Sequence, residues 1–451
     1  MTIRYVNHTD REHAITNVGK QRYLTGTQLD AEWDAVWRKS WLIAGLAEDV
    51  ANAGDFFVFD IAREQILVTR TGAGDVRAYY NVCQHRGNLL VTEERGTAAN
   101  FRCAYHAWTY DLEGQLSAVP YKERFVDRTP GCEQALQTVH VEIWKGIVFV
   151  NLDADPMPLA RYLTAELTTL LEPYRFEKMT LAEDQTVRLE CNWKAVVDNF
   201  SELYHVDFLH PQHRRMVDCC NDTVHLFENG HTGLEVPGAT FNPRFPVPAE
   251  PTDIHTAQLK AWGLDPADFV GRVPDIRRAI QVRRREVGRD MGFDFDAFSD
   301  AQLSDVWQFN FFPNCMLTFT PGHLWILRVR PDVHDPERCQ LDKLSLTMFA
   351  DPEVAGDAVR DAGGGGSRSH FIVDGVKPAD WQRPERDVFD YDAVIAGDKT
   401  MTDTIDQDVE LLGNVQRGMR SAGFSRTWLN DDEMRVQHFH NEIDRLIESG
   451  G

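Results

Sequence analysis

The chain has 451 residues, of which 43% are hydrophobic, 10% aromatic and 26% charged, a composition typical of globular proteins and not of disordered ones. Its 47 basic and 70 acidic residues give a net charge of −23. Nucleic acid is therefore not an expected partner, because phosphate binding needs a basic surface.

The chain also lacks the signals of membrane insertion and of export. No apolar run approaches the roughly 20 residues that a membrane-spanning helix needs, so no membrane partner is expected. The first residues, Met1–Tyr5, lack the apolar core of a secretion signal. Eight cysteines are too few for a disulfide scaffold in a chain of this length. We therefore expect a cytoplasmic protein whose cysteines bind metal or pack in the core.

The first third of the chain, from about residue 40 to 155, is predicted to be β-rich. Short apolar runs such as Phe56–Phe59 and Ile147–Val150 alternate there with Gly, Asp and Asn turn residues. The remainder is mixed, and an α+β architecture follows, with a small β domain near the N-terminus and a larger domain after it. In this second part we expect helices at Arg161–Pro173, Trp193–Leu209, within 260–300 and from about Thr400, and strands at Leu317–Thr320, His323–Val329 and Leu344–Ala350.

A glycine run at Gly363–Gly366, followed by Ser367, is predicted to be a flexible loop or hinge. It lacks the glycine spacing and the Lys-Ser/Thr ending of a phosphate-binding loop.

Two cysteine–histidine pairs form the first candidate site. Cys83 and His85 form one pair, and Cys103 and His106 form the other. Two thiolates and two imidazoles suit either a zinc ion or an iron–sulfur cluster with mixed ligands, and chance placement of core residues is the remaining alternative. Zinc fingers usually pair like with like in each half. One cysteine and one histidine per half favours a two-iron cluster, with both cysteines on one iron and both histidines on the other.

A second candidate site lies at 199–211. At about 100° per residue, the polar residues Asp198, Glu202 and His205 fall opposite an apolar stripe on the predicted helix, which alone would also suit a solvated face. The stripe consists of Trp193, Val196, Val197, Phe200, Tyr204 and Phe208. His210 precedes Pro211, so the helix should end there. Unwinding near His210 would let His205 and His210 bind one metal ion, and two imidazoles with a carboxylate are the ligand set of non-haem Fe(II) oxygenases.

The carboxylate is predicted to come from the helix at Thr400–Ser421. Asp408 falls in the middle of the inward-facing apolar stripe of that helix, whereas Asp403, Asp406 and Glu410 face outward. Acidic side chains are seldom buried unless they are paired or bind a metal. Asp408 is therefore the best candidate for the third ligand. The alternative is a buried aspartate bonded to backbone or to a neighbour such as Gln416.

These motifs carry a family resemblance. The stretch Cys83–Tyr110 resembles the Rieske domain of ring-hydroxylating oxygenases, and the whole chain resembles the large (α) subunit of Rieske non-haem iron oxygenases, most densely at 81–116 and 192–211. The resemblance implies a helical segment at 1–40 that packs on the catalytic domain, a Rieske domain at 41–158 and a catalytic domain at 159–451 with a helix-grip (START/Bet v1-like) fold. It also implies a [2Fe–2S] cluster on the first site and a mononuclear Fe(II) on His205, His210 and Asp408.

The resemblance further implies a homotrimer (α3), or α3β3 with a small subunit, in which the two metal centres communicate between subunits. The bridging acid, usually aspartate in this family, corresponds to Glu202, on a path from His106 to His205. Glutamate is typical of a subset that includes oxygenases of quaternary ammonium compounds. Asn199 matches a family position near the iron, and a purely structural role is the alternative.

The expected function is that of a terminal oxygenase acting on O2 and a small organic substrate. Electrons from NAD(P)H would come through a partner reductase, with or without a ferredoxin, because the chain shows no dinucleotide fingerprint. The leading expectation is dihydroxylation of an aromatic ring, and the alternative is a Rieske monooxygenase that hydroxylates or demethylates. A Rieske electron carrier without oxygen chemistry is the third reading. Several apolar side chains are expected either to line the pocket or to form sheet core: Phe309, Phe311, Phe312, Leu317 and Phe319.

Overall fold

The computed structural model describes residues 4–5, 17–125, 130–215, 217–354 and 376–450. The predicted glycine loop at Gly363–Ser367 lies outside these residues. The chain divides into two compact units, one comprising Ala31–Tyr162 and the other comprising the residues up to Asp30 together with Leu163–Ser449. The predicted α+β fold class is confirmed, with β-rich structure in the first unit and an antiparallel sheet with helices in the second.

The unit Ala31–Tyr162 contains a seven-stranded antiparallel sheet and a small three-stranded sheet. The large sheet has the order β2-β11-β10-β5-β4-β3-β6. Its strands are β2 (Leu42–Leu46), β3 (Asp55–Ile61), β4 (Glu64–Arg70), β5 (Val76–Tyr80), β6 (Arg95–Thr97), β10 (Thr138–Trp144) and β11 (Ile147–Asn151). The small sheet consists of β7 (Phe101–Arg102), β8 (Thr109–Tyr110) and β9 (Leu116–Ala118). Helix α3 of this unit spans Leu159–Tyr162.

The other unit is built on a nine-stranded sheet of order β1-β13-β14-β15-β16-β17-β18-β12-β19. Every neighbouring pair is antiparallel except β12 and β19. The strands are β1 (Arg4–Tyr5), β12 (Met179–Leu189), β13 (Thr223–Leu226), β14 (Thr232–Val236), β15 (Val306–Phe311), β16 (Cys315–Thr320), β17 (His323–Pro331), β18 (Cys339–Met348) and β19 (Asp387–Asp390).

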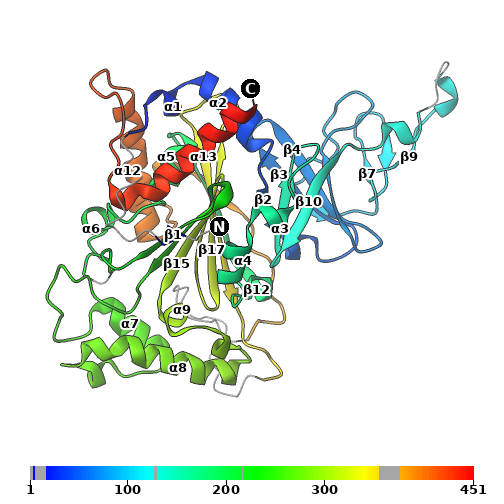
Figure 1. Ribbon diagram of the computed structural model, residues 1–451. Helices are drawn as coiled ribbons and strands as arrows, with labels where there is room; N and C mark the ends of the chain where they lie inside the picture. The colour runs from blue at the N-terminus through cyan, green and yellow to red at the C-terminus, as the bar shows by residue number, and fades with distance from the viewer. Residues whose placement is uncertain (1–3, 6–16, 126–129, 216, 355–375, 451) are drawn as a thin grey trace. The chain divides into compact units, whose positions relative to one another are not determined.

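The helices of this unit gather toward the two ends of the strands, with α5, α12 and α13 near one end and α7, α8 and α9 near the other (Figure 1). Their bounds are α1 (Gln21–Leu24), α2 (Gly26–Glu32), α4 (Ala165–Leu170), α5 (Trp193–Asn199), α6 (Val206–Leu209), α7 (Asp253–Ala261), α8 (Ile276–Met291), α9 (Asp300–Ser304), α11 (Tyr391–Ile395), α12 (Asp403–Met419) and α13 (Met434–Gly450). No helix among the described residues is long and apolar enough to cross a membrane.

The two faces of the nine-stranded sheet differ in chemistry. Across neighbouring strands, Gln308 pairs with Thr318, Thr318 with Trp325, and Trp325 with Ser345, so these side chains lie on one face of the sheet. Asn310, two residues after Gln308 on β15, lies on the same face. This face, which we call the polar face, packs under the helices: Asn310 Nδ2 donates to Ser201 Oγ at the end of α5 at 2.7 Å. The opposite face carries an aromatic cluster in which Phe309 contacts Trp307 and Phe319. Trp307 and Phe319 also contact Tyr174, and Phe319 contacts Phe176.

The register therefore separates the two readings of the apolar residues near 307–325. Phe309 pairs with Leu317, and Phe319 pairs with Trp307, so all four lie on the face away from α5. Phe311 has the same alternation, and Phe312 follows the strand and contacts Phe439 of α13. These side chains are sheet core, which is one of the two roles expected for them from the sequence.

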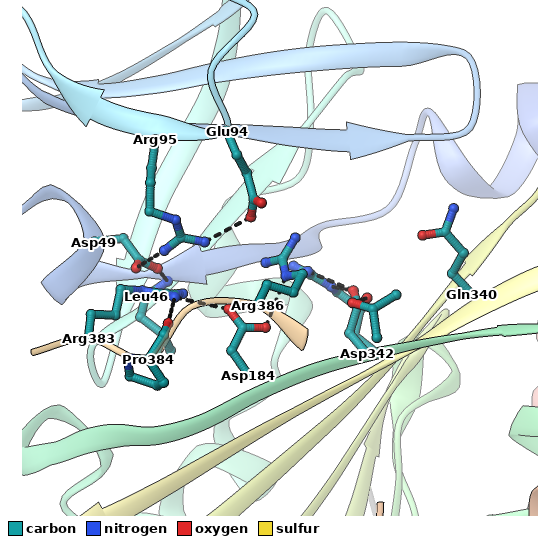
Figure 2. A network of polar contacts seen from close by, with 12 residues as sticks. Leu46, Asp49, Glu94, Arg95, Asp184, Gln340, Asp342, Arg383, Pro384 and Arg386 are labelled. Carbon is teal, nitrogen blue, oxygen red and sulfur yellow. Dashed lines mark hydrogen bonds and ion pairs between the residues drawn. The ribbon is translucent and has the colours of Figure 1, made fainter. Parts of the chain in front are cut away.

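Two buried aspartates hold charged side chains against this sheet. Asp342 of β18 is fully buried and accepts hydrogen bonds from Arg328 Nε at 2.8 Å and from Arg330 Nε and Nη2 at 2.9 and 2.8 Å. Burial works to raise the pKa of Asp342, but the charges of Arg330 and Arg328 hold that pKa well below its usual range. Nearby, Figure 2 shows Arg383 and Arg386 directed at Asp184 of β12, which they contact at 3.0 and 2.9 Å.

We predict that Asp342→Asn lowers the free energy of unfolding at pH 7 by about 3–5 kcal/mol, because two buried guanidinium groups lose their counter-charge. Urea denaturation followed by circular dichroism measures this. The difference from wild type should shrink as the pH falls below about 4, since a carboxyl with a lowered pKa stabilises only where it is ionised. Asp387→Asn is the control: its partner Lys399 is half-exposed, so it should cost no more than about 1 kcal/mol. Equal losses in both variants would contradict the prediction.

Candidate functional site

The segment that carries the two predicted iron-binding histidines is not the single helix predicted from the sequence. Helix α5 ends at Asn199, the chain then turns, and α6 begins at Val206. Two side chains in the turn take local backbone partners: Ser201 Oγ donates to Val197 O at 2.5 Å, and Glu202 Oε2 accepts from His205 N at 3.1 Å. Such bonds compete with regular helix, which explains the break.

The break overturns part of the predicted apolar stripe. Tyr204 and Phe208 were expected to face inward with Val196 and Val197, yet their exposed fractions are 53% and 76%. The helical phase that placed them on the buried side is lost at Phe200. The residues of α5 proper, up to Val197, are buried as predicted.

His205, His210 and Asp408 come together in this unit. One potential ligand atom from each lies within 4.8 Å of the others. Asp408 Oδ1 is 3.2 Å from His210 Nε2 and 3.6 Å from His205 Nε2, and the two imidazole rings are 5.1 Å apart. Asp408 and His210 are buried, with exposed fractions of 1% and 2%. The unwinding predicted near His210 is present, since His210 ends α6 outside helical geometry.

The surroundings of Asp408 decide between the two sequence-based readings of this residue. Among the described residues, no donor makes a hydrogen bond of good geometry to the buried Asp408 Oδ1. Gln416, the neighbour proposed as an alternative partner, instead accepts from the backbone N of Asn192 at 2.9 Å and donates to Glu337 at 2.8 Å. A buried carboxylate oxygen beside two imidazole nitrogens, without a donor, fits a bound cation.

Glu202 contacts the first histidine of this group. Its Oε1 lies 2.5 Å from His205 Nδ1, which leaves Nε2 as the nitrogen that faces Asp408. Burial works to lower the pKa of His205, but Glu202 and Asp408 together raise it. A carboxylate on the far nitrogen of a histidine is the usual arrangement behind a metal ligand, where it fixes ring orientation and tautomer.

Three further residues lie in or near the group. Asn199 is the last residue of α5, and its buried Nδ2 makes no hydrogen bond to any described residue. Gln407, which precedes Asp408 on α12, has Oε1 2.6 Å from His210 Nδ1. Gln407 is not among the site residues predicted from the sequence, although it directly precedes the predicted ligand Asp408. His213, near His210, contacts Thr404 Oγ1 through its Nε2 at 2.8 Å.

In the unit Ala31–Tyr162, two tight loops present the four residues of the first candidate site. Cys83 N donates to Asn88 O and Gly87 N to Cys83 O, while Cys103 N donates to Trp108 O and Ala107 N to Cys103 O. Gly87 and Ala107 adopt positive φ values of 73° and 57°, which close these turns. The two loops have the same hydrogen-bond pattern, but the histidine comes two residues after the cysteine in the first loop and three residues after it in the second.

The four side chains face one another. The rings of His85 and His106 are 4.6 Å apart, and the ring of Trp108 stacks on His85 at 4.6 Å. Cys83 and Cys103 are both 2% exposed. Burial raises the pKa of the Cys83 thiol, and the neighbouring Cys103 raises it further, while burial, His106 and Arg86 lower the pKa of His85.

These atoms fit an iron–sulfur cluster with mixed ligands. The buried Nδ1 atoms of His85 and His106 have no hydrogen-bond partner among the described residues. Cys83 Sγ is 3.6 Å from Tyr110 OH, and Asn88 Nδ2 is 3.9 Å from Cys103 Sγ, so polar groups already surround the sulfurs. Two thiols and two free imidazole nitrogens, gathered from two loops, form the donor set of a Rieske centre.

Most of the other cysteines pack as free thiols. Cys191, Cys219, Cys315 and Cys339 are buried and unbridged, and Cys220 is half-buried and unbridged. Burial raises the pKa of Cys219 to about 12, so this thiol stays protonated at neutral pH. The adjacent residues Cys219 and Cys220 do not form a disulfide.

Two family models match this chain. A family described as the Rieske [2Fe-2S] domain matches residues 40–140, and a family described as the ring hydroxylating alpha subunit (catalytic domain) matches residues 176–449. A glycine betaine monooxygenase oxygenase subunit from Pseudomonas aeruginosa is 32% identical over 45% of this chain and 46% of its own length. A biphenyl 2,3-dioxygenase subunit alpha from Rhodococcus jostii is 30% identical over 39% of each chain.

The matched stretches thus span less than half of these two curated relatives. The fold similarity extends further: a solved quaternary ammonium Rieske monooxygenase in complex with L-carnitine matches with a TM-score of 0.65 and 17% identity, over 98% of this chain and 99% of that one. The chain therefore combines a Rieske [2Fe–2S] domain with a catalytic domain of the kind that holds a mononuclear iron. It belongs to the family of ring-hydroxylating oxygenase α subunits.

Proposed function

We propose that this protein is the terminal oxygenase of a multicomponent Rieske system, which inserts oxygen from O2 into a small organic substrate. The observation that carries the proposal is that ligand atoms of His205, His210 and Asp408 lie within 4.8 Å of one another. Oδ1 of Asp408 has no hydrogen-bond donor among the described residues. NAD(P)H would supply two electrons through a separate reductase, with or without a ferredoxin, and the subunits would assemble as α3 or α3β3.

In this proposal each predicted residue has one role. Cys83 and Cys103 would hold one iron of the cluster, His85 and His106 the other, and the triad of His205, His210 and Asp408 the mononuclear iron. When bound, the cluster supplies single electrons and the mononuclear iron supplies O2 activation. Glu202 accepts a hydrogen bond from Nδ1 of His205 and leaves Nε2 as the nitrogen that faces the metal. Nδ2 of Asn199, which has no hydrogen-bond partner among the described residues, would orient a neighbouring group at the site.

Glu202 would also connect the two kinds of centre in the assembled oligomer. Its carboxylate already accepts from His205, and it would accept from His106 of the partner subunit in the same way. A carboxylate between two imidazoles gives a short hydrogen-bonded connection for an electron.

We propose that one oxygen atom enters the substrate, and that this substrate is small and polar, such as a quaternary ammonium compound. The balance is R–H + O2 + NAD(P)H + H⁺ → R–OH + H2O + NAD(P)⁺, and a hydroxylated N-methyl group would leave as formaldehyde. Glutamate rather than aspartate at position 202 supports this choice. The glycine betaine monooxygenase relative, at 32% identity, supports it too.

The polar face of the sheet gives a second reason to favour a polar substrate. Beside Asn310 and toward the other end of the strands, this face carries buried His323, Ser345 and Thr347. His323 Nε2 is 3.3 Å from Ser345 Oγ, and burial lowers the pKa of His323 to about 4, so its imidazole is neutral. Thr347 Oγ1 has no hydrogen-bond partner among the described residues. A hydrocarbon lying on this face would leave the hydroxyl of Thr347 unsatisfied, at a cost of about 1–3 kcal/mol.

Dihydroxylation of an aromatic ring, the leading expectation from the sequence, is the second candidate. Here both oxygen atoms enter the product: Ar–H2 + O2 + NAD(P)H + H⁺ → cis-diol + NAD(P)⁺. The biphenyl 2,3-dioxygenase relative, at 30% identity, favours it. The two candidates share every metal-binding residue and differ in the fate of the second oxygen atom.

The iron content of Asp408→Asn tests the proposed metal site. We expect three irons per chain in the reconstituted wild type and two in the variant, because an amide oxygen is a weaker ligand than a carboxylate. Elemental analysis gives the count, and the Rieske electron paramagnetic resonance signal should be unchanged. A Rieske carrier without oxygen chemistry would hold two irons in both proteins.

The substitution Glu202→Gln tests the bridge. We expect both metals to be retained and product formation in a single turnover to fall by about 100-fold, since the amide cannot carry the negative charge between two imidazoles. Glu202→Asp, which keeps the carboxylate, should retain most of the activity. Full activity in the glutamine variant would refute the bridging role.

A single turnover of the reduced, iron-loaded protein with ¹⁸O2 decides between the two reactions. We expect mass spectrometry to find one labelled atom in the product, or formaldehyde carrying it, when quaternary amines are offered. Two labelled atoms in the product of an aromatic acid or polycyclic hydrocarbon would establish the dioxygenase instead.

A further inference from the structure

The two histidines of the proposed iron site have different hydrogen-bond partners on their far nitrogens. Nδ1 of His205 faces the carboxylate of Glu202 at 2.5 Å, whereas Nδ1 of His210 faces the amide oxygen of Gln407 at 2.6 Å. An amide oxygen only accepts, so the His210 ring must carry its proton on Nδ1. Nε2 is then the nitrogen with a free lone pair, and it is the one that lies 3.2 Å from Asp408 Oδ1.

The Gln407 amide is itself oriented by a neighbour. Gln212 Nε2 donates to Gln407 Oε1 at 3.0 Å, and Gln407 Nε2 donates back to Gln212 Oε1 at 3.4 Å. Gln212 Nε2 also lies 3.5 Å from Thr404 Oγ1, one turn earlier on α12. With Gln212 in this orientation, a reversed Gln407 amide would place its NH2 group against the NH2 group of Gln212. The contact with Gln212 therefore favours the orientation in which the Gln407 oxygen faces His210.

We infer that Gln407 is a positioning residue that holds His210 in the Nδ1-protonated tautomer and fixes its ring for iron binding. This inference rests on the proposed function, because it concerns the same iron site. Gln407 acts through His210 and does not itself face the metal. It directly precedes Asp408, so one turn of α12 supplies both a ligand and the residue that orients a second ligand.

Gln407 is a neutral residue at this site. Asp408 and Glu202 already bring two carboxylates to the site, which balance the two charges of Fe(II). A third carboxylate at position 407 would orient His210 equally well and leave the site with an excess negative charge. The amide orients the ring without adding charge.

The test compares Gln407→Leu, which removes the acceptor at similar volume, with Gln407→Glu, which keeps it. Fe(II) affinity of the cluster-loaded protein is measured by competition with a chromophoric chelator. We expect the leucine variant to bind Fe(II) about 10–100-fold more weakly and the glutamate variant to bind at least as tightly as wild type. The visible spectrum of the Co(II)-substituted protein should change in the leucine variant and not in the glutamate variant.

Gln212→Leu is the graded comparison, because it removes the amide that orients Gln407 but leaves Gln407 itself as the acceptor for His210. It should weaken Fe(II) binding by no more than about threefold, the loss expected for one exposed neutral hydrogen bond. Should the leucine variant fail to fold, as judged by loss of the Rieske absorbance, Gln407→Asn withdraws the same amide by one methylene and is expected to weaken binding similarly.

Wild-type affinity in Gln407→Leu, or equal losses in the leucine and glutamate variants, would overturn the inference. Asp408→Asn, measured in the same assay, separates this failure from failure of the proposed function. If Asp408→Asn loses Fe(II) while Gln407→Leu retains it, the iron site stands and the positioning role falls. If neither variant loses Fe(II), the proposed iron site itself is wrong.

Discussion

A buried carboxylate beside two imidazoles, with no hydrogen-bond donor to its Oδ1 among the described residues, is the constraint on which the rest of the catalytic unit depends. Removing Asp408 from water is costly unless a positive charge faces it, and the described residues around its Oδ1 supply only His205 and His210. The apolar stripe of α12 places the carboxylate there, because Ile405, Val409 and Leu412 are buried on the same side. Core packing thus fixes an aspartate in a position where only a cation relieves it.

The histidines reach this carboxylate because the chain between α5 and α6 is not helical. His205 and His210 are five positions apart in the chain, and a regular helix would place their side chains about 140° apart. The turn at Phe200–His205, held by Ser201 and Glu202, brings both rings to one side. The same turn leaves Tyr204 and Phe208 exposed beside the site. A local departure from helix therefore creates the site and a surface next to it at once.

Sequence patterns predicted the parts of this architecture that depend on period and spacing. The burial of Asp408 follows from helical phase, and the two Cys–His loops follow from spacing, since each pair is local. The helix break at Phe200 could not be predicted, because Ser201 and Glu202 fit a helical pattern until their side chains take backbone partners. Gln407 was missed for a related reason: its significance comes from His210, which lies almost 200 residues earlier, and no local pattern encodes that contact. The sheet register, which moved Phe309 and Leu317 away from α5, is likewise a long-range property.

The cap of α5 ties the metal ligands to a wider mechanical unit. Asn192 begins α5, its side chain accepts from Lys194 N, and its backbone N donates to Gln416 of α12. Helix α12 thus meets α5 through Gln416, faces His205 and His210 through Asp408, and orients His210 through Gln407. A slip of α12 by one residue would rotate it by about 100° and break all of these contacts together. The position of α12 therefore sets the ligand Asp408, the orientation of His210 and the link to α5 together.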